Sequence, residues 1–378
     1  MRDDWKTNNF DFLRLALAIL VIYSHSYPLG TGAETAEPLY RATHGQMTLG
    51  AVAVDLFFVM SGFLIAASAE RSRGVIGFLK KRVARIYPAF LVGSFLTLLF
   101  VLPISSGRWA ESSALGRFWD FSGNTLRLLT PTFVDAFPSN PYPGVINGSI
   151  WSIPFEFWCY IGVALLLITG LLRNRLLLLG SFLVAVIVSV LFQAEGWILG
   201  GKILGRILGS PQLWARLLPL YLAGVVFYLF RKHIKLTGWG AAISLLALVL
   251  ASNLRLGWTA IFPFAGTYLV FYSAFASWIR LNRFGRFGDF SYGTYLYAFP
   301  IAQIIMKWIG HPVSPATLFF CVTPPTLVLA VASWYGVERH FLGRSRKGED
   351  RGEARDLRPL PHVYGNGHAS VAAAGNAE

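Results

Sequence analysis

The sequence predicts an all-α polytopic membrane protein, a bundle of about ten transmembrane helices. Hydrophobic residues make up 54% of the 378 residues and charged residues only 14%, against about a quarter charged in an average soluble domain. Together with a mean hydropathy of +0.53, this composition exceeds what one soluble core of this length can bury. The apolar residues also fall in runs near the length that a helix needs to cross a bilayer.

Ten such runs follow one another along the chain, and each is expected to form a helix. The seventh is short and leads almost directly into the eighth, so these two could form a hairpin that is partly re-entrant. The expected runs are Phe10–Leu29, Leu49–Ala69, Ile86–Ile104, Ile150–Gly170, Leu176–Gln193, Leu213–Phe230, Thr237–Ala251, Trp258–Trp278, Ser291–Ile309 and Thr317–Val337.

Two segments differ from the helical runs. Ser105–Asn147 is rich in Pro, Gly, Ser and aromatic residues, and could cap the outer side of the bundle or lie along the membrane interface. The last 36 residues, 343–378, are polar and lack a hydrophobic period, which is typical of a disordered cytoplasmic tail. The sequence therefore predicts one transmembrane domain over residues 8–342, followed by that tail.

The basic residues fall mainly on one side of this predicted topology. The net charge is +14, and with the N-terminus in the cytoplasm, 23 of the 33 Lys and Arg residues lie in inward segments. Such asymmetry is what the positive-inside rule predicts, and it favours an even number of helices with both termini in the cytoplasm. A nucleic-acid partner is therefore not needed to explain the charge.

The two cysteines, Cys159 and Cys321, both fall inside predicted helices and have no CxxC spacing. This pattern indicates neither a disulfide framework nor a metal site. We expect both to be small core residues.

The first run carries two ionisable side chains in DFLRLALAILVIYSH, namely Arg14 and His25. Eleven helical steps of about 100° return the helix to within roughly 20° of the same face, and the rise of 1.5 Å per residue separates the two by about 16 Å. Ionisable groups at such depth are costly, so a functional site is the default hypothesis.

Two carboxylates are predicted at a depth similar to that of His25. Asp55 falls in the outer half of the second helix and Glu156 in the outer half of the fourth. A histidine oriented by a carboxylate is a standard general base, since its pKa lies near neutrality. The alternative is that each group only makes a polar contact between helices.

At the inner end of the third helix stands KKRVARIYP, with Arg82 and Arg85 on one helical face. Such a pair can bind phosphate oxygens. Arg14, on the same side of the membrane, adds a third cation. The alternative is an ordinary positive-inside anchor or a contact with lipid headgroups, and the spacing alone favours this alternative.

Five segments in this order resemble the acyltransferase-3 family of integral-membrane acyltransferases. They are FDFLRLALAILVIYSH, VDLFFVMSGFLI, RVARIYP, SIPFEFWCYI and SYGTYLYAFP. The resemblance implies a ten-helix bundle in the bacterial inner membrane. It also implies transfer of an acyl group, most often acetyl and sometimes succinyl, from cytoplasmic acyl-CoA to a sugar hydroxyl of an exopolysaccharide, a lipopolysaccharide or a lipid-linked saccharide.

Residue by residue, the resemblance places the family's functional positions on six residues. It implies catalytic roles for His25, Asp55 and Glu156, and CoA-phosphate binding by Arg14, Arg82 and Arg85; no tightly bound cofactor or metal is expected. Members often have a late Tyr-x-x-His-x-Pro segment, where this chain reads YLYAFP with Ala298. This departure argues against a second essential histidine.

The resulting hypothesis is that His25 deprotonates the acceptor hydroxyl or itself takes the acyl group transiently. Asp55 or Glu156 would fix the tautomer of the imidazole, and the arginines would hold the phosphates of acyl-CoA. A different class, a proton-coupled transporter or flippase with a relay of His25, Asp55 and Glu156, remains open. A scaffold for polysaccharide-synthesis machinery would leave the buried charges unexplained.

Overall fold

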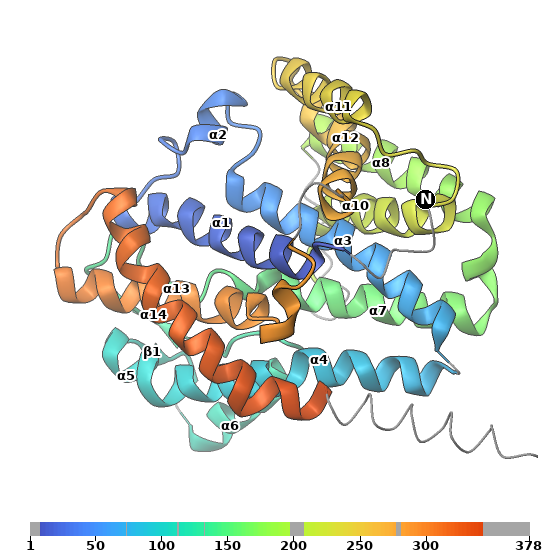
Figure 1. Cartoon of the computed structure of the whole chain (residues 1–378). Coiled ribbons are helices and arrows are strands. Elements are labelled where there is room, and N and C mark those ends of the chain that lie inside the picture. The colour runs from blue at the N-terminus through green and yellow to red at the C-terminus, as the bar shows by residue number, and fades with distance from the viewer. Residues whose placement is uncertain are drawn as a thin grey trace, which may run out of the picture.

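The computed structural model describes residues 8–72, 74–111, 113–131, 133–196, 208–276 and 281–342, so the predicted tail lies outside the described residues. Regular structure within these ranges is almost entirely helical (Figure 1). The long helices are α1 (Phe10–Thr31), α3 (Leu49–Arg71), α4 (Val75–Leu96), α7 (Ile153–Ile168), α8 (Arg175–Glu195), α10 (Pro211–Phe230), α11 (Gly238–Ala251), α12 (Gly257–Ala274), α13 (Ser291–Ile309) and α14 (Pro315–Ser333).

Shorter elements extend or connect these helices. They are α2 (Pro38–Ala42), η2 (Thr97–Val101), α5 (Leu102–Ser105), β1 (Arg108–Trp109), α6 (Ala114–Leu126), β2 (Phe133–Val134), η3 (Ile150–Ser152), η4 (Leu171–Arg173), η5 (Phe284–Phe287) and η6 (Trp334–Glu338). β1 and β2 form a small antiparallel pair.

All ten predicted runs are helices, which confirms a helical polytopic membrane protein. Within the described residues, seven are long and apolar enough to span a membrane: α1, α3, α4 through α5, η3 with α7, α8, α10, and α14 through to residue 342. The predicted count of about ten spans exceeds this number for physical reasons. α11 has only 14 residues, and α12 and α13 are rich in Tyr, Trp, Gly and Pro, which lowers their hydropathy.

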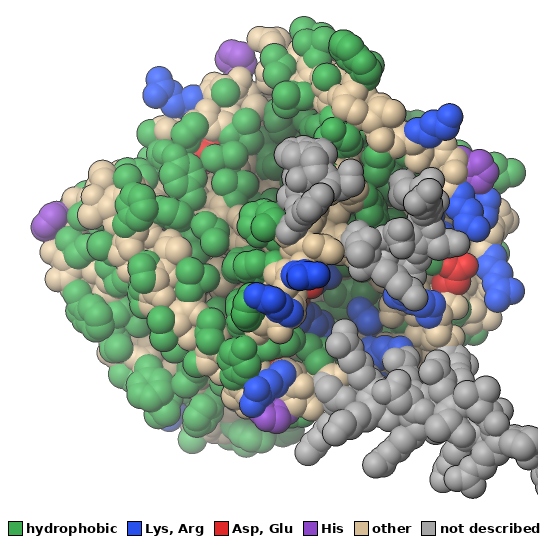
Figure 2. Space-filling model, in the orientation of Figure 1, with side chains coloured by type: hydrophobic (Ala, Val, Ile, Leu, Met, Phe, Trp, Pro, Cys, Tyr) green, Lys and Arg blue, Asp and Glu red, His purple; other side chains and the backbone are tan. Residues whose placement is uncertain are grey.

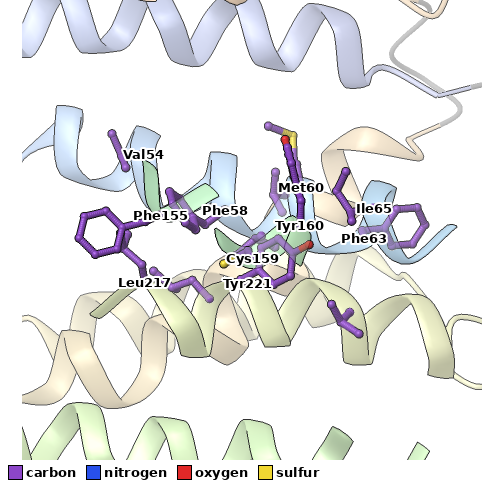
Figure 3. Close-up of a cluster of buried hydrophobic side chains, with 14 of the residues drawn as sticks. Val54, Phe58, Met60, Phe63, Ile65, Phe155, Cys159, Tyr160, Leu217 and Tyr221 are labelled. Carbon is purple, nitrogen blue, oxygen red and sulfur yellow. The ribbon is translucent and has the colours of Figure 1, made fainter. Parts of the chain in front are cut away.

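Helix α3 lies in the middle of the bundle (Figure 1). Thirteen of its 23 residues are buried, among them the consecutive Phe58, Val59 and Met60, so neighbouring helices cover it on several sides. In Figure 3, its buried side chains meet those of α7 and α10 in one apolar cluster. This packing fixes the relative position of three helices that line the cavities described below.

Two glycines allow α3 and α10 to approach closely. A Cβ atom at Gly62 would lie 2.0 Å from the carbonyl oxygen of Tyr221, and one at Gly224 would lie 1.9 Å from that of Val59. Small residues at helix contacts are a common device of membrane bundles, where backbones gain van der Waals contact by close approach. The glycine pair therefore sets the distance between these two helices.

The predicted hairpin of the seventh and eighth runs is confirmed, since α11 and α12 pack against each other. The backbone N–H of Thr237 donates to the hydroxyl of Tyr268 over 2.8 Å. At the other end, the side chain of Gln46 donates to the carbonyl of Ser252 over 2.8 Å. These bonds tie the hairpin to itself and to the loop before α3.

The segment predicted to cap the bundle is folded against it. Gln303 of α13 is fully buried and donates to the carbonyls of Tyr142 and Val145 over 2.8 and 2.7 Å. Asn140 donates back to the Gln303 side chain over 2.8 Å. The part of the segment before α7 therefore covers α13, while α6 lies beside α4, where the Tyr87 hydroxyl donates to the carbonyl of Leu126.

The expectation for the cysteines is confirmed at one position and wrong at the other. Cys159 is buried on α7, whereas Cys321 is exposed on α14, and both are free thiols. Exposure of an apolar side chain on a bundle helix is ordinary where lipid surrounds the helix, because lipid is as apolar as the side chain. Position within an apolar run therefore did not distinguish core from lipid-facing surface.

The close contact of α3 and α10 generates a stability test. We expect Gly224→Ala to cost about 1–3 kcal/mol because the added methyl group must push the helices apart. Thermal unfolding of the detergent-solubilised protein measures this loss. Gly180→Ala on α8 is the matched control, since a Cβ atom there meets nothing within 4 Å and alanine favours the helix. Equal melting temperatures of the two variants would contradict the packing argument.

Candidate active site

The first of two adjoining cavities, here called the histidine cavity, has a volume of about 680 Å³. His25 and Asp55 both line it, as do the aromatic side chains of Trp151 and Trp258. His25 and Asp55, predicted to lie together, therefore line one cavity.

The second cavity, here called the arginine cavity, has a volume of about 710 Å³. It is lined by Arg14, Arg82 and Arg85, so the three predicted phosphate-binding residues also share a site. The two cavities adjoin, since Val54 and Tyr295 line both of them.

His25 lies on α1 with its ring edge-on to that of Phe299, at a centroid distance of 5.4 Å. Its Nδ1 atom is buried and has no hydrogen-bond partner within the described residues. A carboxylate partner for this nitrogen was the prediction, and in the described ranges neither Asp55 nor Glu156 provides one. Because His25 lines the cavity, its imidazole can exchange a proton with a hydroxyl bound there.

Asp55 pairs with the guanidinium of Arg216 and not with His25. Its Oδ1 atom accepts from Nε and Nη2 of Arg216 on α10, over 3.1 and 2.8 Å. Arg216 also donates to the carbonyl of Ala51 over 3.1 Å. Since the Asp55 side chain is only 3% exposed, the pair neutralises a buried charge and joins α3 to α10.

Glu156 lies in the arginine cavity and not beside His25. It lines the arginine cavity, where its Oε1 atom accepts from the hydroxyls of Tyr160 and Ser61 over 2.5 and 2.9 Å. Glu156, predicted at the same depth as His25 and Asp55, therefore lines a different cavity from these two residues.

The reason is the place where the helix begins. Ser149 and Ile150 at its start are already 1% and 5% exposed, and the carbonyl of Ser149 accepts a hydrogen bond from Tyr295, which lies between the cavities. The helix thus starts well inside the protein, and counting residues from its end places Glu156 too far out.

Arg14 and Arg85 converge on a carboxylate that the sequence analysis missed. Oδ2 of Asp289 lies 2.9 Å from Nη1 of Arg14 and 2.6 Å from Nη2 of Arg85. Its Oδ1 atom accepts from the backbone N–H and the hydroxyl of Ser291 over 3.2 and 2.5 Å. Burial alone would raise the pKa of Asp289, but the two guanidinium groups hold that pKa well below its usual range. Asp289 therefore stays ionised and bridges α1 and α4.

Arg82 has a different environment from Arg85, although both lie on one face of α4. Its Nη2 atom donates to the hydroxyl of Ser68 over 3.1 Å, and its guanidinium lies 5.7 and 5.8 Å from the ring centroids of Phe78 and Tyr160. Its Nε atom is buried without a hydrogen-bond partner in the ranges described. Arg82 thus lines the cavity with no carboxylate bonded to it among the described contacts.

Positive charge is in excess around the arginine cavity. Lys and Arg side chains gather around a hollow on the face shown in Figure 2. The described lining holds six basic side chains against three carboxylates: Arg14, Arg71, Lys81, Arg82, Arg85 and Arg339, with Asp11, Glu156 and Asp289. Such an excess in a concave site attracts a polyanion.

A π-helical turn contributes another residue that the sequence did not single out. In η6, Trp334 lines the arginine cavity, while Glu338 is 2% exposed and has a carboxylate oxygen 3.8 Å from Nη1 of Arg85. π-turns inside α-helices are frequent at functional sites. The sequence carried no signal for this turn, but it did carry one for Arg216, an ionisable residue within an apolar run.

Comparisons with known proteins assign the chain to a family. A family described as an acyltransferase domain matches residues 7–335. The chain is 32% identical to the O-acetyl transferase of Shigella phage Sf6, over 90% of this chain and 97% of that protein.

It is also similar to nodulation protein 10 of Rhizobium leguminosarum bv. viciae, at 27% identity over 88% of this chain and 92% of that protein. The exopolysaccharide production protein ExoZ of Rhizobium meliloti is 26% identical, over 80% and 93% of the two chains. No solved structure gives a significant match. The chain therefore belongs to the acyltransferase-3 family and is an acyltransferase.

Proposed function

We propose that this acyltransferase moves an acyl group, acetyl in the first instance, from acyl-CoA to a sugar hydroxyl of an exported or cell-surface polysaccharide. The observation that carries the proposal is the pair of adjoining cavities, one basic and one containing an unpaired histidine. The names of the relatives, an O-acetyl transferase and an exopolysaccharide production protein, support this acceptor class. A transporter would leave the family membership unexplained.

In the proposed reaction, the diphosphate and the ribose phosphate of acyl-CoA bind in the arginine cavity. Six basic side chains against three carboxylates favour a polyanion there. Arg82 lines this cavity and has no carboxylate bonded to it among the described contacts, so its guanidinium can pair with a phosphate. Arg14 and Arg85 contribute positive potential while they hold Asp289.

The acceptor sugar occupies the histidine cavity. His25 takes the proton of the acceptor hydroxyl while that oxygen attacks the thioester carbonyl. The carbon–oxygen ester bond forms, the carbon–sulfur bond breaks, and the departing thiolate takes the proton from the imidazolium to give the free thiol of CoA. His25 is thereby returned to its neutral form.

The two carboxylates have separate roles in this scheme. Asp55 orients Arg216 at the wall of the histidine cavity, while Glu156 is placed with Tyr160 beside the donor. In this scheme, neither carboxylate orients the ring of His25. The excess of Lys and Arg in the predicted inward segments supports a cytoplasmic opening of the arginine cavity.

The role of His25 can be tested with purified protein, radiolabelled acetyl-CoA and polysaccharide extracted from cells that lack the gene. We expect His25→Ala to lower kcat by about 10²- to 10⁴-fold because the general base is lost. The melting temperature should stay close to that of the wild type. His311→Ala is the matched control, since His311 is exposed and lines neither cavity. Wild-type turnover by His25→Ala would refute the proposed catalytic role.

The donor site can be tested through Arg82. We expect Arg82→Ala to raise the KM for acetyl-CoA by about 10- to 100-fold, since a hydrogen bond to a charged group contributes about 1.5–3 kcal/mol, with kcat little changed. Initial rates over a range of donor concentrations separate the two constants. Arg173→Ala serves as the control because Arg173 is exposed and outside both cavities. A lower kcat with an unchanged donor KM would rule out phosphate binding by Arg82.

A further inference from the structure

We propose that Val54 and Tyr295 form a constriction that limits the size of the acyl group that the enzyme transfers. This inference rests on the proposed function, in which the donor binds in the arginine cavity and the acyl group reaches His25 in the other. Val54 and Tyr295 are the two described residues that line both cavities. An acyl group that reaches the junction of the cavities therefore lies between these two side chains, while the pantetheine arm stays in the arginine cavity.

Both sides of the constriction are held in place by packing. Val54, on α3, is 6% exposed and belongs to the main apolar core, and in Figure 3 it lies beside Phe155. Its backbone belongs to the helix that the glycine contact fixes against α10. Because protein interiors are close-packed, Val54 has little room to move aside for a larger group.

Tyr295 is anchored at both ends of its side chain. Its hydroxyl donates to the carbonyl of Ser149 and shares a hydrogen bond of 2.8 Å with the hydroxyl of Ser152. Its ring meets that of Phe57 at a centroid distance of 6.2 Å and an interplanar angle of 67°. The ring is thereby fixed between α3 and the start of α7.

The constriction lies close to His25. Tyr295 stands one helical turn before Phe299 on α13, and the ring of Phe299 contacts that of His25. On α3, Val54 directly precedes Asp55 of the histidine cavity. A thioester carbonyl held at the junction of the cavities, within reach of a hydroxyl beside His25, therefore has its acyl chain against Val54 and Tyr295.

The chemistry of this wall favours a short acyl group. A valine side chain and the edge of a fixed aromatic ring offer apolar contact to a methyl group, but each further methylene would have to displace packed atoms. One methylene in such a pocket changes kcat/KM by about 10- to 200-fold. Acetyl, the smallest of the common acyl groups, is thus the donor that the constriction admits best.

A competition assay tests the constriction. The purified protein receives equal concentrations of acetyl-CoA and butyryl-CoA with the extracted polysaccharide, and mass spectrometry measures the ratio of butyryl to acetyl product. We expect Val54→Ala to raise this ratio by about 10-fold or more, because it removes two methyl groups from the wall. Val54→Ile should lower the ratio. The ratio is independent of how much protein is folded.

Val59→Ala is the matched control, since Val59 is a buried valine on the same helix that lines neither cavity. It should leave the product ratio as in the wild type. An unchanged ratio in both Val54 variants, or an equal shift in Val59→Ala, would overturn the constriction. If the wild-type protein transferred no acyl group from either donor, the proposed function itself would fail, which is a distinguishable result.

Discussion

The arrangement of the bundle depends on one requirement, that an ionised side chain between apolar helices has to be paired. Asp289 meets this requirement for two arginines at once, by joining Arg14 of α1 to Arg85 of α4 immediately before α13 begins. Three helices distant in sequence are thereby held around one carboxylate. The arginine cavity is lined by the members of this bridge and by four further basic side chains, those of Arg71, Lys81, Arg82 and Arg339.

A second ion pair, between Asp55 and Arg216, joins α3 to α10. Because Arg216 on α10 donates to Asp55 through both Nε and Nη2, this carboxylate is paired with a guanidinium and not with His25. The histidine therefore lies in a cavity with its Nδ1 atom unpaired within the described residues. The ion pairs of Asp289 thus lie at the arginine cavity, and the ion pair of Asp55 lies at the histidine cavity.

The sequence predicted the helices well because each is an apolar run, and apolar length is set by the bilayer itself. It identified His25 and Arg14 by the same logic, as costly charges inside such a run. The sequence did not predict which charged side chains pair with one another. Asp289 lies in a short polar connection where a carboxylate is unremarkable, and Glu156 was misplaced because residue counting assumes that every helix starts at the same level. Contacts between helices depend on tilt and rotation, which periodicity leaves undetermined.

The close placement of the two cavities also bears on a competing reaction. A thioester in an open aqueous site is exposed to hydrolysis, whereas exclusion of water favours transfer to the intended hydroxyl. Tyr295, held by Phe57 and by hydrogen bonds to Ser149 and Ser152, lies with Val54 at the junction of the arginine cavity and the histidine cavity. A filled constriction would therefore serve selectivity twice under the proposed function: an acyl group that fits it also displaces the water that would otherwise reach the thioester.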